Sequence, residues 1–447
     1  MSLDSRYRTV TQAALWILFA CGGGLFLAGL PLHVPFKLWV VASLGVAIAL
    51  LAHLADETAY RRTANVLLVV LAASGVASAF EFLRQPFLPL CAGAALVASI
   101  LAARRGGLPR LAAMGVVVLA AAFGLAEATL GSQRGSDDVV TEVRERSGGA
   151  WRRARGFSVP DAARGFAGRP DTEVRVRYRR SGELVYDALY TLDGRGRRVT
   201  PGSAPGAPNL VFLGDSFAFG EGVADHETAP AQLVARMPEL RPLNLGFKGY
   251  GPHQALATLE AGLETDLIPL GANALGVYYA TFDPGRAVGK ALWDTTGPRY
   301  ERTSDGRLVN RGPFSAHWQG RMLALAHRSH LLGRMIRGRA PSGSERDLFV
   351  ALIERTDELF RERHGGPFLA VLWGEERDEC LDEVASRLAS RQIELRVVRN
   401  AAPGRAEVGP NRLLGDGHPS PSGQAHIATL IEDWVTRGVR APNPEAP

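Results

Sequence analysis

The sequence predicts two unlike parts: an α-helical transmembrane domain, followed by an α/β domain with a parallel sheet between layers of helices. At 447 residues the chain is long enough for more than one domain. Up to about residue 130 it is mostly Ala, Leu, Val and Gly, and beyond that point it is rich in Arg, Asp, Glu, Pro and Gly. In the second part, short apolar runs alternate with segments of helical spacing, which is typical of parallel α/β folds.

The N-terminal part contains about five apolar runs of membrane-spanning length. Buried helices of a soluble protein would show polar faces, and these runs have almost none. We therefore expect a multi-span domain over residues 1–130, with the lipid bilayer as its partner. The runs cover residues 13–30, 36–54, 64–80, 87–103 and 111–130.

The short loops between these runs predict the orientation. Cationic loops stay on the cytoplasmic side of a membrane. Arginines concentrate before the first run and in two alternate loops: Arg6, Arg8, Arg61, Arg62, Arg104, Arg105 and Arg110. The other two connections have one cation each, Lys37 at the edge of the second run and Arg84. We expect a multi-pass protein of the inner (cytoplasmic) membrane, with a cytoplasmic N-terminus and a periplasmic, extracytoplasmic C-terminal part.

Charge and cysteine usage exclude several classes of function. The net charge of +6 comes from dispersed arginines, and no run combines basic and aromatic residues as a nucleic-acid face does, so we expect no nucleic-acid partner. Cys380 is the only cysteine outside the apolar runs and cannot form an internal disulfide. Because no metal-ligand spacing occurs, we expect neither a metal nor a cofactor.

A linker and a small β module are expected over residues 131–208, beginning with a polar segment, 131–138. Apolar and charged residues alternate through 174–178 and again through 184–190, with Ser181 and Gly182 between them. Period-two alternation on both sides of a turn predicts a β-hairpin. Such a module caps a neighbouring domain or binds a partner.

The C-terminal domain, over residues 209–440, is organised around its first strand. The apolar run 210–213 predicts a buried parallel strand, and Gly214-Asp215-Ser216 ends it. Ligands bind at the carboxyl ends of such strands, and the start of the following helix favours negative charge. Further strands are expected over 274–280, 368–373 and 393–398, and helices over 230–237, 254–263, 348–361 and 380–388.

Three segments of this domain resemble the SGNH (GDSL) hydrolase family. The stretch 214–217, Gly-Asp-Ser-Phe, resembles the first sequence block of that family. The stretch 243–253 resembles the second block, and 416–427, beginning Asp-Gly-His, resembles the fifth. The resemblance implies a three-layer, flavodoxin-like domain that performs ester chemistry.

The resemblance also implies roles for individual residues. Ser216 is the expected nucleophile, His418 its general base and Asp416 the residue that orients the base. The N–H groups of Gly249 and Ser216 are expected to form the oxyanion hole. The asparagine that the third block should supply is absent, so either the Thr281 hydroxyl replaces it or the hole has two donors.

The spacing between Asp416 and His418 is less usual for the family. Only Gly417 separates Asp416 from His418, where two residues are common, and an extended backbone would let the pair share a face. His253 is the last residue of the stretch that resembles the second block, and it either contacts substrate or bonds to backbone at the start of a helix.

The leading hypothesis is serine-dependent hydrolysis of an extracytoplasmic ester, an acylated glycan or a small ester, through an acyl-serine. Transfer of the acyl group to a sugar hydroxyl is the first alternative, with polysaccharide-synthesis proteins as partners. The second alternative is a catalytically inactive module that binds glycan.

Overall fold

The computed structural model describes residues 138–147, 149–204, 206, 209–337, 339–400, 411–413 and 416–440. The five segments expected to cross a membrane lie outside these residues, so that expectation stays a prediction. Among the helices that are described, none has both the length and the apolar character of a membrane span.

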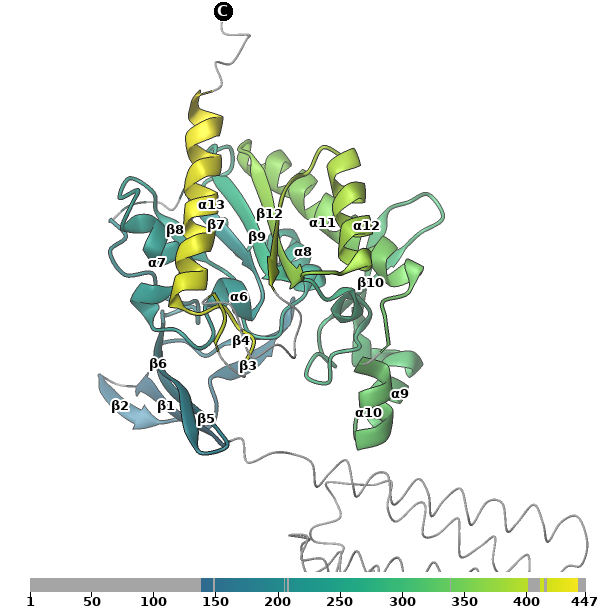
Figure 1. Cartoon of the computed structure of the whole chain (residues 1–447), viewed down its shortest axis with the longest axis horizontal. Coiled ribbons are helices and arrows are strands. Elements are labelled where there is room, and N and C mark those ends of the chain that lie inside the picture. Colours follow the sequence, from purple (N-terminus) through teal and green to yellow (C-terminus); the bar gives the residue numbers. More distant parts are fainter. Residues whose placement is uncertain are drawn as a thin grey trace, which may run out of the picture. The chain divides into compact units, whose positions relative to one another are not determined.

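A five-stranded sheet forms the centre of the α/β domain, and all its strands are parallel (Figure 1). The predicted parallel α/β architecture is therefore confirmed. The sheet order is β13-β12-β9-β7-β8, the doubly wound order in which ligands bind where the winding reverses, between β7 and β9. The strands are β7 (Leu210–Gly214), β8 (Pro242–Asn244), β9 (Leu275–Thr281), β12 (Phe368–Glu375) and β13 (Glu394–Asn400).

Helices cover both faces of this sheet, which gives three layers (Figure 1). Strands buried on both sides are apolar throughout, as in β7, whose five residues are all buried. One face is packed by α8 (Pro252–Glu260), α11 (Gly343–His364) and α12 (Glu379–Ser390). The other face is packed by α7 (Ala229–Val234) and α13 (Pro421–Arg440).

The β module is a four-stranded antiparallel sheet of order β2-β1-β5-β6, with a small hairpin beside it. The predicted hairpin is present as β5 and β6, and Ser181 and Gly182 at its turn both have positive φ. The sequence did not predict β1 and β2. The second half of β1 is mostly Arg and Glu, and only one apolar side chain of the strand, Val143, is buried, so β1 lacks the alternation of apolar and polar residues. The strands are β1 (Asp138–Ser147), β2 (Ala150–Arg153), β3 (Ser158–Asp161), β4 (Gly165–Gly168), β5 (Thr172–Arg180) and β6 (Glu183–Leu192).

The module shares a hydrophobic core with the α/β domain. Tyr190 of β6 packs edge-on against Phe219 at a centroid distance of 5.3 Å. The Tyr190 hydroxyl also accepts a hydrogen bond of 2.9 Å from the N–H of Gly222. The packing therefore supports the capping alternative: the module covers the turn that carries Ser216.

A segment between β9 and α11 contributes a short hairpin and two helices. Of the four Phe, Tyr and Trp side chains in residues 287–318, Tyr300 and Phe314 are buried, while Trp293 and Trp318 are exposed. Its elements are η3 (Pro284–Val288), β10 (Pro298–Arg302), β11 (Leu308–Pro313), η4 (Phe314–Ala316), α9 (Trp318–Ala326) and α10 (His330–Arg337).

Candidate active site

The nucleophile turn is built by a glycine and a capping carboxylate. Gly214 ends β7 with φ 144°, and a Cβ there would lie 1.9 Å from the backbone oxygen of Tyr279. Only glycine lets β9 pass this close. Asp215 then caps the short helix α6 (Ser216–Phe219), and its Oδ1 accepts from Phe217 N at 2.8 Å. Ser216 is thereby the first residue of a helix at the carboxyl end of the sheet.

Asp215 holds this turn through its second oxygen. Its Oδ2 accepts from Arg286 Nη1 at 2.8 Å and from Thr281 N at 3.2 Å. Burial raises the pKa of Asp215, although the positive charge of Arg286 and the backbone N–H donors oppose the change. Arg286 also donates to the Tyr250 carbonyl at 2.8 Å. The carboxylate therefore ties the turn to the loop after β8.

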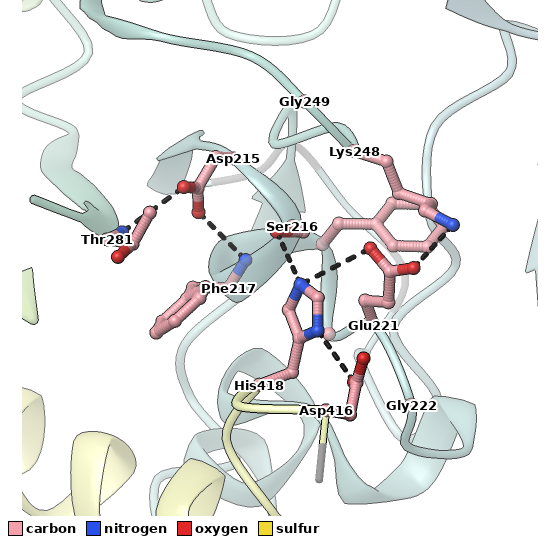
Figure 2. A network of polar contacts seen from close by, with 12 residues as sticks. Asp215, Ser216, Phe217, Glu221, Gly222, Lys248, Gly249, Thr281, Asp416 and His418 are labelled. Carbon is pink, nitrogen blue, oxygen red and sulfur yellow. Dashed lines mark hydrogen bonds and ion pairs between the residues drawn. The ribbon is translucent and has the colours of Figure 1, made fainter. Parts of the chain in front are cut away.

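Ser216, His418 and Asp416 meet although 202 residues separate the first two (Figure 2). His418 Nε2 lies 2.9 Å from Ser216 Oγ. Its other ring nitrogen, Nδ1, lies 2.7 Å from Asp416 Oδ2. This is the relation of nucleophile, base and orienting carboxylate that acyl transfer through serine requires.

The charges around His418 favour its protonated form. Burial disfavours the imidazolium, but the hydrogen bond to Asp416 and the negative charges of Glu221, Asp416 and Asp215 outweigh it, so the pKa of His418 is raised. A general base must be neutral to accept the serine proton. Activity that depends on His418 should therefore be lost on acidification at a higher pH than for an ordinary histidine.

The short spacing between Asp416 and His418 depends on Gly417. The expectation of an extended backbone is wrong, because Gly417 has φ 86° and lies in the left-handed region. The N–H groups of Asp416 and Gly417 both approach the Leu413 carbonyl at 3.2 Å, so the chain turns here. With one intervening residue, this turn brings the Asp416 carboxylate back to the imidazole.

Replacing Gly417 by Ala should lower kcat on the order of tenfold, because a left-handed alanine costs about 1–2 kcal/mol and shifts Asp416. The nearest atom to the new Cβ would be 4.0 Å away, so no clash adds to this strain. Gly182→Ala is the matched control, since Gly182 has φ 87° and no neighbour within 4 Å. Both variants should lose similar unfolding free energy, and equal kcat values would contradict a role for Gly417 at the site.

Gly249, the expected second oxyanion donor, lies in the loop after β8. It has φ 81°, and a Cβ there would lie 2.4 Å from Trp293 Nε1. Trp293 donates to the Gly249 carbonyl at 2.9 Å and so fixes this peptide. Its loop is bonded to the nucleophile turn, since Phe247 N donates to the Gly214 carbonyl at 3.2 Å. Within the described residues, no group accepts from the N–H of Ser216 or Gly249.

Thr281 is placed beside Asp215 (Figure 2), and the structure does not bring its hydroxyl to Ser216. The hydroxyl donates instead to the Trp373 carbonyl at 3.4 Å. The geometry thus favours the alternative of a hole with two backbone donors.

Thr281→Ala should change kcat less than about threefold, because the N–H that holds Asp215 remains and the lost hydroxyl bond is weak. Thr281→Ser, which keeps the hydroxyl, is the control. A loss of about 10²–10³-fold in the alanine variant alone would show that the hydroxyl is an oxyanion donor after all. Steady-state kinetics on an aryl acetate distinguish these results.

His253 is not placed to contact substrate, which corrects that expectation. Its side chain is fully buried, and Nε2 lies 2.6 Å from Asp294 Oδ2. Gln254 donates to the other oxygen of Asp294 at 2.8 Å and accepts from Gly251 N at 2.7 Å. The histidine therefore supports the loop after β8 from inside, through a carboxylate rather than through backbone.

A glutamine that the sequence motifs did not single out fixes the nucleophile helix. Gln424 is buried on α13, donates to the Phe217 carbonyl at 3.1 Å and accepts from Ala229 N at 3.0 Å. Its spacing from Ile427 and Ile431 puts it on the apolar face of the helix, and a polar residue there was the available signal.

Glu221 and Lys248 are two further residues at the site that the sequence motifs did not single out. Glu221 Oε2 lies 3.4 Å from His418 Nε2, and Glu221 Oε1 pairs with Lys248 Nζ at 2.5 Å (Figure 2). The available signal was a carboxylate between two glycines, Gly220 and Gly222, five residues after the nucleophile. In the part of the chain that the structure describes, no cluster of His, Cys, Asp or Glu could hold a metal ion.

The fold and the site together define a parallel α/β domain with a Ser–His–Asp arrangement at the winding reversal. No protein-family model matches the chain, and no curated protein matches it. Among solved structures, the chain is similar to a protein from Desulfitobacterium hafniense DCB-2 assigned to the G-D-S-L family of lipolytic proteins. That match has 13% identity and a TM-score of 0.29, covering 50% of this chain and 97% of the other.

A second similar structure is a family two carbohydrate esterase from Clostridium thermocellum, in complex with cellohexaose. The match has 10% identity and a TM-score of 0.30, and it covers 68% of this chain and 90% of the other. Matches at these values carry no function over to this chain, so its function is inferred from the geometry of the site.

Proposed function

We propose that this protein is an SGNH (GDSL)-type hydrolase that cleaves ester bonds through an acyl-serine at Ser216. The observation that carries the proposal is the arrangement of three side chains, with His418 Nε2 2.9 Å from Ser216 Oγ and Nδ1 2.7 Å from Asp416. A binding module has no need of this arrangement, so the inactive alternative is not favoured.

The reaction follows from these contacts. As Ser216 Oγ attacks the ester carbonyl, its proton passes to His418 Nε2, and the imidazolium then gives that proton to the departing alcohol oxygen. Water enters, loses a proton to the same nitrogen and attacks the acyl-serine. His418 then returns that proton to Ser216 Oγ as the acid leaves, which restores Ser216 and the neutral imidazole. Asp416 keeps the proton of Nδ1 in place throughout. The N–H groups of Ser216 and Gly249 are the proposed donors to the oxyanion.

An acylated glycan is the proposed substrate class, and Trp293 supports it. Trp293 is 54% exposed although its indole N–H is bonded to Gly249, so an aromatic surface borders the proposed oxyanion hole. Sites for ligands combine such aromatic surface with a few fixed polar groups. The charge asymmetry of the N-terminal loops supports an extracytoplasmic location for this site, where surface and exported glycans are found.

The test is release of the acyl group by the purified full-length protein, followed by mass spectrometry, with acetylated glycans and aryl acetates as substrates. The proposal predicts free acetate from the wild-type protein and none above background from Ser216→Ala. Movement of the acyl group to a sugar hydroxyl would instead establish an O-acyltransferase. No Ser216-dependent loss of acyl groups from any substrate would overturn ester chemistry and leave the glycan-binding module.

A further inference from the structure

A second carboxylate lies at the working nitrogen of the proposed base. Glu221 Oε2 is 3.4 Å from His418 Nε2, the same nitrogen that contacts Ser216 Oγ (Figure 2). Asp416, in contrast, lies on the opposite ring nitrogen. The Glu221 side chain is 12% exposed and the His418 side chain is 20% exposed, so solvent screens this contact only in part.

The position of Glu221 is fixed by its backbone. Glu221 N donates to the carbonyl of Ser216 at 2.9 Å, so the main chain of Glu221 is held against that of the nucleophile. Gly220 and Gly222 on either side have φ 81° and 85°. Gly222 is bonded to the Tyr190 hydroxyl, and a Cβ on Gly222 would lie 2.2 Å from a methyl carbon of Leu413. The β module therefore clamps this loop against the nucleophile turn.

Lys248 balances the charge of this carboxylate. Its ammonium lies 2.5 Å from Glu221 Oε1, which leaves Oε2 directed at His418. Lys248 also lies over the ring of Phe157 at 5.4 Å and directly precedes Gly249. The pair thus joins the proposed base to the loop that carries the oxyanion donor.

We propose that Glu221 is a positioning residue for His418: Glu221 acts on Nε2 of the imidazole as Asp416 acts on Nδ1. This inference rests on the proposed function, because it concerns the base of that reaction. When Ser216 gives up its proton, the new N–H of the imidazolium lies beside the Glu221 carboxylate. The carboxylate stabilises the positive charge until the proton passes to the departing oxygen. Glu221 itself gains and loses no proton.

Other charged and titratable groups around His418 also influence its protonation. Asp416 comes from the loop before α13, and Asp215, which directly follows β7, pairs with Arg286. From β6, Tyr186 and Tyr190 face Glu221 and Asp416, and burial raises the pKa of both hydroxyls, so they stay neutral. Glu221 and Lys248 therefore form the charged pair whose removal should change the pH at which His418 titrates most directly.

The test is a pH titration of His418 in the full-length protein labelled with [13C]histidine, with the resonance assigned through its loss in His418→Gln. Glu221→Gln should move the titration to lower pH, because a negative charge beside the imidazolium is removed. Lys248→Met should move the titration to higher pH, because the negative charge of Glu221 is then no longer offset by the ammonium and stabilises the imidazolium more. Glu239→Gln, which removes the same charge at an exposed position, is the control and should match wild type.

Kinetics provide the second readout. The acid limb of the pH–kcat profile should move in the same two directions. On its plateau, kcat should fall on the order of tenfold in Glu221→Gln, against about 10⁴–10⁶-fold in His418→Ala. A misfolded site would not give opposite shifts in the two variants. If His418 titrates alike in wild type and Glu221→Gln, the inference is overturned. The titration needs no turnover, so an inactive protein with the expected shifts would overturn only the proposed function.

Discussion

Ser216→Ala and His418→Ala are each expected to reduce kcat for ester cleavage by about 10⁴–10⁶-fold without unfolding the protein. The alanine at 216 has no hydroxyl to attack with, and the alanine at 418 has no nitrogen to accept its proton. Because the two side chains act as one unit, the double variant should lose little more than either single variant. Steady-state kinetics on an aryl acetate measure all three losses.

His426→Ala is the matched control for the histidine change. His426 lies eight residues further on, is exposed on α13, and contacts no part of the site that the structure describes. Its replacement should leave kcat within about twofold of wild type, because exposed residues away from the core and the site usually tolerate substitution. Losses that multiply in the double variant would contradict the joint action of Ser216 and His418.

Arg198→Met is expected to cost about 3–5 kcal/mol of unfolding free energy, because it leaves Asp225 and several carbonyls without their partner. The Arg198 side chain is fully buried, and Nε lies 2.6 Å from Asp225 Oδ1. The same guanidinium donates to the carbonyls of Phe219, Gly220 and Val223 at 3.3, 3.2 and 2.9 Å.

Arg195→Met is the control for this change. Its side chain is 61% exposed and its ion pair with Asp266 lies at the surface, so the loss should stay within about 1 kcal/mol. Urea unfolding followed by tryptophan fluorescence compares the two variants. Equal losses would contradict the view that Arg198 holds together the loop that bears Glu221.

The central sheet was predictable because its strands are buried on both faces. Runs such as 210–213 are apolar throughout and are bounded by turn residues, so their pattern is local and strong. The triad residues were predictable because each stands in a short motif that resembles a known family. The β1 strand was not predictable, since its Arg and Glu side chains alternate on a sheet whose inward face is filled mostly by β5 and β6.

The remaining parts of the site depend on contacts between segments far apart in the chain. His253 can be buried because its imidazole contacts Asp294, 41 residues further on in the chain, and no residue near His253 in the sequence predicts that partner. The role inferred for Glu221 likewise needs His418, which returns to the sheet only after β13. Gly417 was noticed for its spacing, but its left-handed turn follows from the three-dimensional closure of the loop.

Labelling with a fluorophosphonate probe, mapped by mass spectrometry of the full-length protein, tests the central claim most directly. The probe reacts with a serine whose oxygen is activated by a neighbouring base, whether or not the natural substrate is known. We expect one adduct on the peptide that contains Ser216 in the wild-type protein, and its loss in His418→Ala. A folded wild-type protein that takes up no probe at Ser216, or labelling that persists at an equal rate without His418, would contradict the account.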